Sequence, residues 1–102
     1  LDVEVELPDY DNLQKPLLEA FLLDPDACAA CTYSWAACEE MIKHFGDKID
    51  VVQYRYNNVP DIARTRKMAV KQLPSIYLNG ECKYSSIIPN PDEFIKQIEE
   101  VL

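Results

Sequence analysis

The sequence is poor in cysteine and has no long apolar run, and each scarcity excludes a class of protein. Four cysteines in 102 residues are too few for the disulfide-dense class of small secreted domains. No apolar run approaches the roughly 20 residues that a transmembrane helix needs. The sequence also contains no internal repeat and no low-complexity segment. We therefore expect a soluble globular protein, located in the cytoplasm.

Basic residues are scarce as well, and this limits the partners that we expect. Ten Lys and Arg residues stand against eighteen Asp and Glu residues, which gives a formal net charge of −8. That charge repels the phosphate backbone of nucleic acids and the head groups of anionic lipids. We therefore expect neither nucleic acid nor a membrane as a partner.

The length and composition predict one domain with a short segment before it. A chain of 102 residues, 48% of them hydrophobic, can bury a core without disulfides or metal ions. Val3, Val5 and Leu7 alternate with acidic residues, which predicts either a short edge strand or a disordered acidic lead-in. We assign residues 1–16 to this segment and residues 17–102 to the domain. Because the sequence does not begin with Met, fusion to a larger protein also stays open.

The first half of the domain predicts a buried strand followed by an amphipathic helix. Residues 17–23 form an apolar run that ends at Asp24-Pro25, as in a strand buried on both faces. Apolar residues then recur at spacings of three and four, and Gly46 stands where the end of a helix favours positive φ. The residues of this stripe are Cys31, Trp35, Cys38, Ile42 and Phe45.

The next segment predicts a second strand and a second helix. Residues 49–56 are rich in β-branched and aromatic residues, which favour a strand. Asn57 and Asn58 precede Pro60 and supply the cap and first-turn signals of a helix. We expect this helix to end near Ala69.

The remaining chain predicts a hairpin and a closing helix. Asn79-Gly80 between two strand-like segments favours a type I′ turn, so the last two strands are antiparallel. Asn90 caps the last helix, with Glu93 at the position of a capping box. The apolar face of that helix consists of Phe94, Ile95, Ile98, Val101 and Leu102.

The order of elements is therefore strand, helix, strand, helix, strand, strand, helix (β-α-β-α-β-β-α). Strands joined through a helix pair in parallel by right-handed crossovers, with the helices on the faces of the sheet. The hairpin adds an antiparallel edge. We therefore expect an α/β fold with a mixed four-strand sheet and helices on both of its faces.

The segment DACAACTYSW, residues 26–35, carries the candidate chemistry. Cys28 and Cys31 follow the first predicted strand and open the next helix, where reactive groups collect in α/β sheets. Two such cysteines can bind a metal, form a static disulfide or exchange disulfides. Because a helix N-terminus favours a thiolate, Cys28 would attack in an exchange and Cys31 would resolve. Asp24 and Asp26 oppose that thiolate through their charge.

Together with a second motif, the cysteine pair resembles the thioredoxin family. Cys28-Ala29-Ala30-Cys31 follows a strand, and Leu73-Pro74-Ser75-Ile76-Tyr77-Leu78-Asn79-Gly80-Glu81 lies downstream. The resemblance covers residues 17–102 and implies the thioredoxin-like fold. It also implies a thiol-disulfide oxidoreductase with Cys28 and Cys31 as its catalytic pair and with no bound cofactor. Its partner would be a protein disulfide or dithiol.

The resemblance assigns substrate contacts as well. In the family, the proline before the third strand has a cis peptide bond and faces the cysteine pair, which implies substrate-binding roles for Leu73 and Pro74. Ala29 and Ala30 would contact the substrate from between the cysteines, where thioredoxin has Gly-Pro. The buried carboxylate of the family matches Leu22 without gaps, so we expect weaker exchange than that of thioredoxin.

The alternative function is an accessory or binding domain of a larger protein, whose cysteines could hold a metal such as zinc. That site would need Cys38 and Cys82 to converge on Cys28. Cys38 should lie about 10 Å along the helix from Cys31, whereas the ligands of one zinc ion lie within about 4 Å of each other. We therefore expect no metal site.

Several further residues have structural interpretations. We expect Cys38 and Cys82 to pack as small hydrophobic residues and Trp35 to lie in the core. Residues 64–67 include three basic side chains and are expected to form a solvated helix face. His44 lies in the last turn of a helix, about two turns or more from the cysteine pair, so we expect no catalytic role for it.

Overall fold

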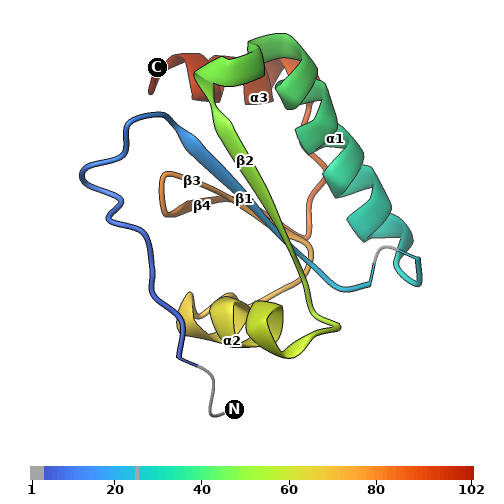
Figure 1. Cartoon of the computed structure of the whole chain (residues 1–102). Helices are drawn as coiled ribbons and strands as arrows, with labels where there is room; N and C mark the ends of the chain where they lie inside the picture. Colours follow the sequence, from blue (N-terminus) through green and yellow to red (C-terminus); the bar gives the residue numbers. More distant parts are fainter. Residues whose placement is uncertain (1–3, 25) are drawn as a thin grey trace.

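The strands and helices follow each other in the predicted order. The computed structural model describes residues 4–24 and 26–102. The elements are β1 (Leu17–Leu22), α1 (Ala29–Phe45), the short 3-10 turn η1 (Gly46–Lys48), β2 (Asp50–Arg55), α2 (Val59–Lys67), β3 (Ser75–Leu78), β4 (Glu81–Ser85) and α3 (Pro91–Glu99). The sheet has the order β2-β1-β3-β4, with β1 parallel to β2 and antiparallel to β3 (Figure 1). The prediction of a mixed four-strand α/β sheet is confirmed.

The cap residues that the sequence predicts begin α2 and α3 and end α1, whereas α2 ends at Lys67, slightly before the predicted Ala69. The side chain of Asn58 accepts a hydrogen bond from the backbone N–H of Asp61 at 3.0 Å, which caps α2. Asn90 caps α3 in the same way. Gly46 ends α1 with a φ of 57°, a conformation that costs glycine little. None of the helices in the described part of the chain has the length and apolar character needed to cross a membrane.

One face of the sheet is covered by α1 and α3, which seal an apolar core against it (Figure 1). β1 contributes Leu18, Ala20 and Leu22, each 0% exposed. The other core side chains include Cys31, Cys38, Met41, Phe45, Ile76, Tyr84, Phe94 and Ile98. The prediction that Ile42 is buried is wrong, since it is 40% exposed and Met41 is buried instead. The buried residue after Cys38 is therefore three positions along the helix, at Met41, rather than four.

The last helix is shorter than its apolar pattern predicts. α3 ends at Glu99, so Val101 and Leu102 lie beyond it and are 42% and 58% exposed. The backbone N–H of Val101 bonds to the carbonyl of Ile98, only three residues back, at 3.1 Å. This tighter turn takes Val101 off the apolar stripe.

The opposite face of the sheet is covered by α2 and contains a buried polar network (Figure 1). Alternate residues of β1 face this side, and Glu19 among them is 0% exposed. Its carboxylate accepts hydrogen bonds from Arg64 at 2.6 Å, Tyr54 at 2.8 Å and Tyr10 at 2.5 Å. The donors come from α2, from β2 and from the segment before β1, so one carboxylate connects three parts of the chain.

The basic segment of α2 is only partly solvated. Arg66 and Lys67 are exposed, as predicted. The same prediction is wrong for Arg64 and Thr65, which are 5% and 4% exposed. Arg64 points inward because its ion pair with Glu19 compensates the desolvation of both charges. Its guanidinium also lies 5.1 Å from the centre of the Tyr54 ring, within the range of a cation–π contact.

The segment before β1 is held by a tyrosine rather than by strand pairing. Glu4–Leu7 form no strand, and Val3 lies outside the described residues. Tyr10 packs its ring against Gly80, where an added Cβ would lie 2.7 Å from Cγ of the ring. Asn79 and Gly80 have φ values of 52° and 83°, as a type I′ turn requires. Tyr10 therefore ties this segment to both the hairpin turn and the polar network.

Candidate active site

Cys28 is the N-cap residue of α1. Its backbone is extended, with a φ of −136° and a ψ of 105°, and its sulfur accepts a hydrogen bond from the N–H of Cys31 at 3.2 Å. The side chain is half-buried. The unpaired N–H groups of a first helical turn stabilise negative charge at this position. The geometry therefore suits a nucleophilic thiolate.

Cys31 lies one turn inside the helix and is 0% exposed. Burial, followed by the hydrogen bond to Cys28, raises the pKa of the Cys31 thiol to about 11, although a backbone hydrogen bond from Leu23 acts in the opposite direction. The thiol is therefore protonated at neutral pH and must lose its proton before it can attack. The prediction that Cys31 is the more buried of the two is confirmed.

The surroundings of Cys31 are apolar. Leu22, which matches the buried carboxylate of the thioredoxin family, is 0% exposed and belongs to the same core. Ser34, one turn further along α1, is 1% exposed, and its hydroxyl has no hydrogen-bond partner in the described part of the chain. The carboxylate that the fold buries is Glu19, which faces α2. The sheet therefore separates the buried carboxylate from the buried thiol.

Leu73 and Pro74 stand directly before β3. The peptide bond between them is cis, as the resemblance implies. Pro74 is buried, and its carbonyl accepts a hydrogen bond from the N–H of Ser86 at 2.8 Å. The antiparallel register pairs Ser75 with Phe21, so Pro74 lies near the carboxyl end of β1. The chain runs from that end of β1 to the cysteine pair. Contact of Pro74 with the sulfurs stays a prediction.

The surface beside Cys28 is hollowed. An open depression of about 440 Å³ is lined by Asp26, Ala27, Cys28, Ala29, Thr32 and Tyr33. Ala29 and Ala30 are exposed, so the two residues between the cysteines leave the approach to Cys28 open. The sequence pattern does not single out Tyr33, because its place in the depression depends on the fold that brings it together with Asp26 and Ala27.

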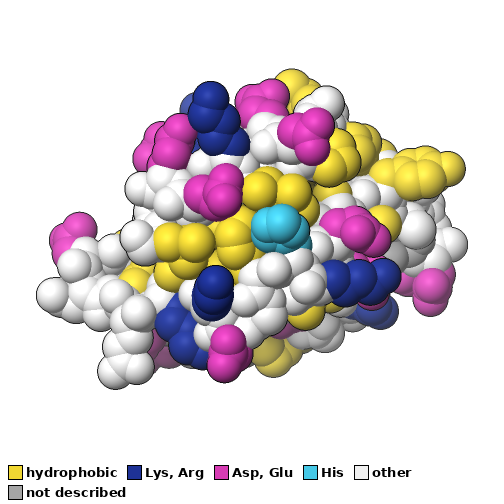
Figure 2. Space-filling view, turned by 90° about the horizontal axis from the view of Figure 1, so that it is seen from above, with side chains coloured by type: hydrophobic (Ala, Val, Ile, Leu, Met, Phe, Trp, Pro, Cys, Tyr) yellow, Lys and Arg dark blue, Asp and Glu magenta, His cyan; other side chains and the backbone are white. Residues whose placement is uncertain are grey.

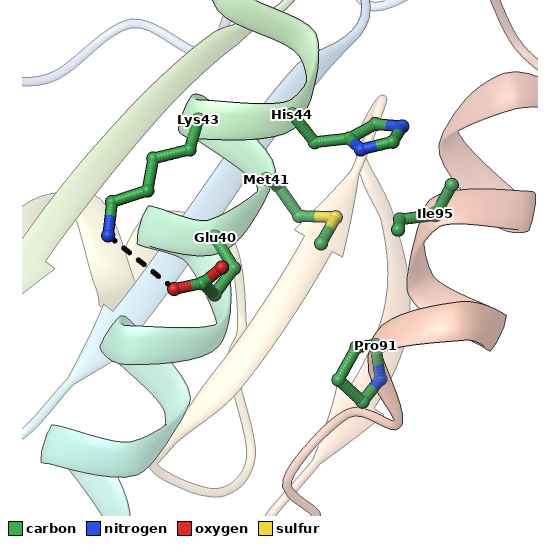
Figure 3. A pocket seen from close by; sticks show the side chains of 6 residues that line it. All are labelled: Glu40, Met41, Lys43, His44, Pro91 and Ile95. Atoms are coloured by element: carbon green, nitrogen blue, oxygen red, sulfur yellow. Dashed lines mark ion pairs between the residues drawn. The ribbon is translucent and has the colours of Figure 1, made fainter.

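A second depression lies between α1 and α3. It measures about 400 Å³ and is lined by Glu40, Met41, Lys43, His44, Pro91 and Ile95 (Figure 3). Figure 2 shows apolar side chains gathered around the single histidine on this face. Glu40 and Lys43 form an ion pair at 3.6 Å on one side. His44 comes thirteen residues after Cys31 (44 − 31), about 20 Å along the helix, so this depression is separate from the cysteine pair.

The two other cysteines lie in different environments. Cys38 is 0% exposed in the core, as predicted, and burial raises the pKa of its thiol to about 12. The prediction that Cys82 packs as a small hydrophobic residue is wrong, because it lies on the edge strand β4 and is exposed to solvent. Trp35 is half-buried and packs against the core. Across residues 4–24 and 26–102, no group of three or more His, Cys, Asp or Glu side chains could hold a metal ion.

Solved structures with the same architecture include two proteins of malaria parasites. One, described only as a malarial protein, is 22% identical and has a TM-score of 0.69, with coverage of 87% of this chain and 99% of that chain. The other is thioredoxin-2, a component of the malaria parasite protein secretion machinery, at 22% identity and a TM-score of 0.69, covering 87% and 86%. No protein-family model matches the sequence, and the comparison with curated proteins gives no match. These likenesses show that the chain has a thioredoxin-like fold.

Proposed function

On this thioredoxin-like fold, we propose that the protein is a thiol-disulfide oxidoreductase in which Cys28 and Cys31 exchange electrons with a disulfide or dithiol of a partner protein. The arrangement at the start of α1 carries the proposal. The half-buried Cys28 sulfur accepts the N–H of Cys31 at 3.2 Å, and the buried Cys31 lies one turn behind it. No bound cofactor is needed, because the two sulfurs themselves carry the two electrons.

The first step forms a mixed disulfide with the partner. The Cys28 thiolate attacks one sulfur of the partner's disulfide, so that a bond forms between these sulfurs and the partner's S–S bond breaks. The electron pair of the broken bond leaves with the partner's second sulfur, which takes a proton from solvent. The N-terminus of α1 stabilises the attacking thiolate before this step.

The second step releases the partner. Cys31 loses its proton to solvent and attacks the Cys28 sulfur, so that the Cys28–Cys31 bond forms and the mixed disulfide breaks. The partner's sulfur leaves with the electron pair of the broken bond and takes a proton from solvent, so the partner is released as a dithiol. Two electrons have then passed to the partner, and an external dithiol returns them by the same steps in reverse. We expect the loss of the proton to limit exchange, because burial raises the pKa of Cys31 to about 11 and Leu22 offers no base.

Four residues around the pair form the proposed substrate-contact surface. Ala29 and Ala30 are small and exposed, so they let a partner segment approach Cys28. Leu73 is half-buried and, with the buried Pro74, precedes the strand that pairs with β1. Such a surface offers backbone and apolar contacts, which suit an extended segment of a protein partner.

The domain division and the location belong to the same proposal. Residues 17–102 make up the redox domain and residues 1–16 its lead-in. The partner is a protein, because a net charge of −8 repels nucleic acid and anionic membranes. We place the reaction in the cytoplasm, where thiol pairs are kept reduced.

The test is reduction of a protein disulfide driven by an added dithiol. Cys28→Ser should abolish turnover, because it removes the attacking sulfur. Cys31→Ser should trap the mixed disulfide, which mass spectrometry detects as a covalent adduct. Cys38→Ala and Cys82→Ala are matched controls, and each should leave turnover nearly intact.

Selective alkylation gives an independent measurement. In a Cys82→Ala background, where the exposed third thiol is absent, reduced protein near neutral pH should be labelled at Cys28 before Cys31. Faster labelling of Cys31 would contradict the assignment of roles. A wild-type protein that exchanges with no dithiol, and whose pair stays reduced under mild oxidant, would leave the accessory-domain alternative in its place.

A further inference from the structure

We propose that the depression beside Cys28 binds a cationic side chain, Lys or Arg, that lies next to the reactive cysteine of the partner. The inference rests on the proposed function, because it names the partner segment that the same site selects. Three observations carry it: the position of the depression, the exposed Asp26 in its wall and the exposed ring of Tyr33.

The depression lies where a residue neighbouring the partner's sulfur must go. Cys28 itself forms part of its wall, together with Asp26 on the preceding loop and Tyr33 on the second turn of α1. Its volume of about 440 Å³ falls in the range of small-ligand clefts, roughly 300–1,000 Å³, so a long side chain fits. In a mixed disulfide with Cys28, a residue next to the partner's cysteine can reach this wall.

Asp26 is held in place by the turn that precedes the helix. The carboxylate of Asp24 accepts a hydrogen bond from the N–H of Asp26 at 3.0 Å, and the carbonyl of Asp24 accepts one from the N–H of Ala27 at 2.9 Å. Asp26 is exposed, and none of the four ion pairs in the described part of the chain uses its carboxylate. These bonds fix the backbone of Asp26 in the wall of the depression, and its exposed carboxylate is available to an incoming cation.

Tyr33 supplies the second half of a cation site. Its side chain is 64% exposed, which is the largest exposure among the large hydrophobic residues of the described chain. An aromatic ring and a carboxylate in one depression suit an ammonium or guanidinium group, because the ring face attracts the cation and the carboxylate pairs with it. A neutral apolar side chain would use only the ring.

The segment that contains the cysteine pair is negatively charged, as Asp26 is. No Lys, Arg or His occurs between Lys15 and Lys43, whereas that stretch contains five acidic residues, Glu19, Asp24, Asp26, Glu39 and Glu40. Apart from the buried Glu19 and from Glu40, which pairs with Lys43, these carboxylates are part of the net charge of −8 that attracts a basic partner. A bound cation also offsets the charge of Asp26 beside the attacking sulfur.

The experiment compares three peptides, each with one internal disulfide, that differ only in the residue next to the attacked cysteine: Arg, Gln or Glu. We expect kcat/KM for reduction to be about fivefold to tenfold higher with Arg than with Glu at low salt, since a cation–π contact and an exposed ion pair each contribute modestly. The ratio should shrink at high salt. Gln should fall between them.

Variants then locate the preference. Asp26→Asn and Tyr33→Ala should each bring the Arg-to-Glu ratio towards one, whereas Asp47→Asn, an exposed acidic residue in η1 after α1, should leave the ratio unchanged. A wild-type ratio near one with all peptides reduced would overturn the inference and leave the proposed function intact. A ratio that survives Asp26→Asn would assign the preference to the overall charge and overturn the site. If no peptide is reduced, the proposed function fails and the inference with it.

Discussion

The two faces of the sheet are stabilised in opposite ways, although the same central strand supplies both. On the α1 and α3 side, β1 presents Leu18, Ala20 and Leu22 to an apolar core. On the α2 side it presents Glu19, whose carboxylate accepts three hydrogen bonds. The first face surrounds Cys31 with apolar side chains and provides no carboxylate that could take its proton. The second face uses directional bonds to fix helix α2 and the N-terminal segment.

The difference shows that this fold places the reactive thiols and the buried ion pair on opposite faces of the sheet. An apolar environment raises the pKa of a buried thiol, as it does for Cys31, and a carboxylate on the same side would change that behaviour. The buried charges lie instead on the far side of β1, where Arg64 meets Glu19 at 2.6 Å. The buried charges on the α2 side therefore lie apart from the cysteine pair.

The largest effect is expected from breaking the ion pair on the α2 face. Arg64→Met leaves the carboxylate of Glu19 buried without its charged partner, so the free energy of unfolding should fall by about 3–5 kcal/mol. Urea denaturation followed by circular dichroism measures the change. Disulfide exchange per folded molecule should not change, because the pair lies on the other face.

Two matched variants identify the cause of that loss. Arg66→Met removes a charge from the exposed part of the same helix and should change the free energy of unfolding by less than about 0.5 kcal/mol. The double variant Glu19→Gln with Arg64→Met removes both charges but keeps an acceptor for the tyrosines, so it should be more stable than Arg64→Met alone. A double variant less stable than the single one would show that the unpaired carboxylate is not the source of the cost.

A somewhat smaller effect is expected on the apolar face, where packing matters and charge does not. Leu18→Ala removes a fully buried side chain of β1 and should lower the free energy of unfolding by about 2–5 kcal/mol. The loss should be the same at low and high salt, because the substitution changes no charge. A loss below about 1 kcal/mol in urea denaturation would mean that this face is loosely packed.

The contact between the hairpin turn and the N-terminal segment should give an intermediate effect. Gly80→Ala places a Cβ 2.7 Å from the Tyr10 ring and should lower the free energy of unfolding by about 1–3 kcal/mol. Gly46 also has positive φ, but no atom lies within 4 Å of an added Cβ, so the cost of Gly46→Ala is backbone strain alone. Tyr10→Ala should make Gly80→Ala less costly than in the wild type.

The smallest effect concerns pH, and it can be measured on each face. Burial, followed by the bond to Glu19, raises the pKa of Tyr10 from 10.0 to about 12, and burial raises that of Cys31 from 9.0 to about 11. The folded protein therefore holds these protons more tightly than the unfolded chain. Their contribution to stability is complete below about pH 9 and is lost as pH rises towards 12.

Single substitutions separate the two contributions. Tyr10→Phe should flatten the loss of stability between pH 10 and 12 and should cost about 1 kcal/mol at neutral pH for the missing hydrogen bond. Cys31→Ala should flatten the loss between pH 9 and 11. Urea denaturation across this range tests both, and unchanged slopes in both variants would contradict the assignment.

The features that the sequence predicts correctly are those with local signals. The order of strands and helices depends on periodicity, the helix starts on Asn58 and Asn90, and the hairpin on Asn79-Gly80, all of which act within a few residues. The cysteine pair is also local, since its spacing and its place after a strand are visible in the sequence. Burial of Cys31 follows from the stripe of α1.

The features that the sequence does not predict depend on residues far apart in the chain. Glu19 stands inside an apolar run, and its partner Arg64 looks like an exposed helix residue, so neither shows its role until the fold brings them together. Tyr10 joins them from a segment that favours an edge strand by alternation alone. Met41, and not Ile42, lies in the core. The pattern does not distinguish them, because spacings of three and of four both fit one face of a helix.

The close packing of Tyr10 on Gly80 has a consequence for how this protein can vary. A glycine in a type I′ turn is usually required by its backbone, but here the space above it is also occupied by a ring. Any side chain at position 80 would therefore require a smaller residue at position 10. In related sequences the two positions should change together, and such paired changes would reveal the contact without any structure.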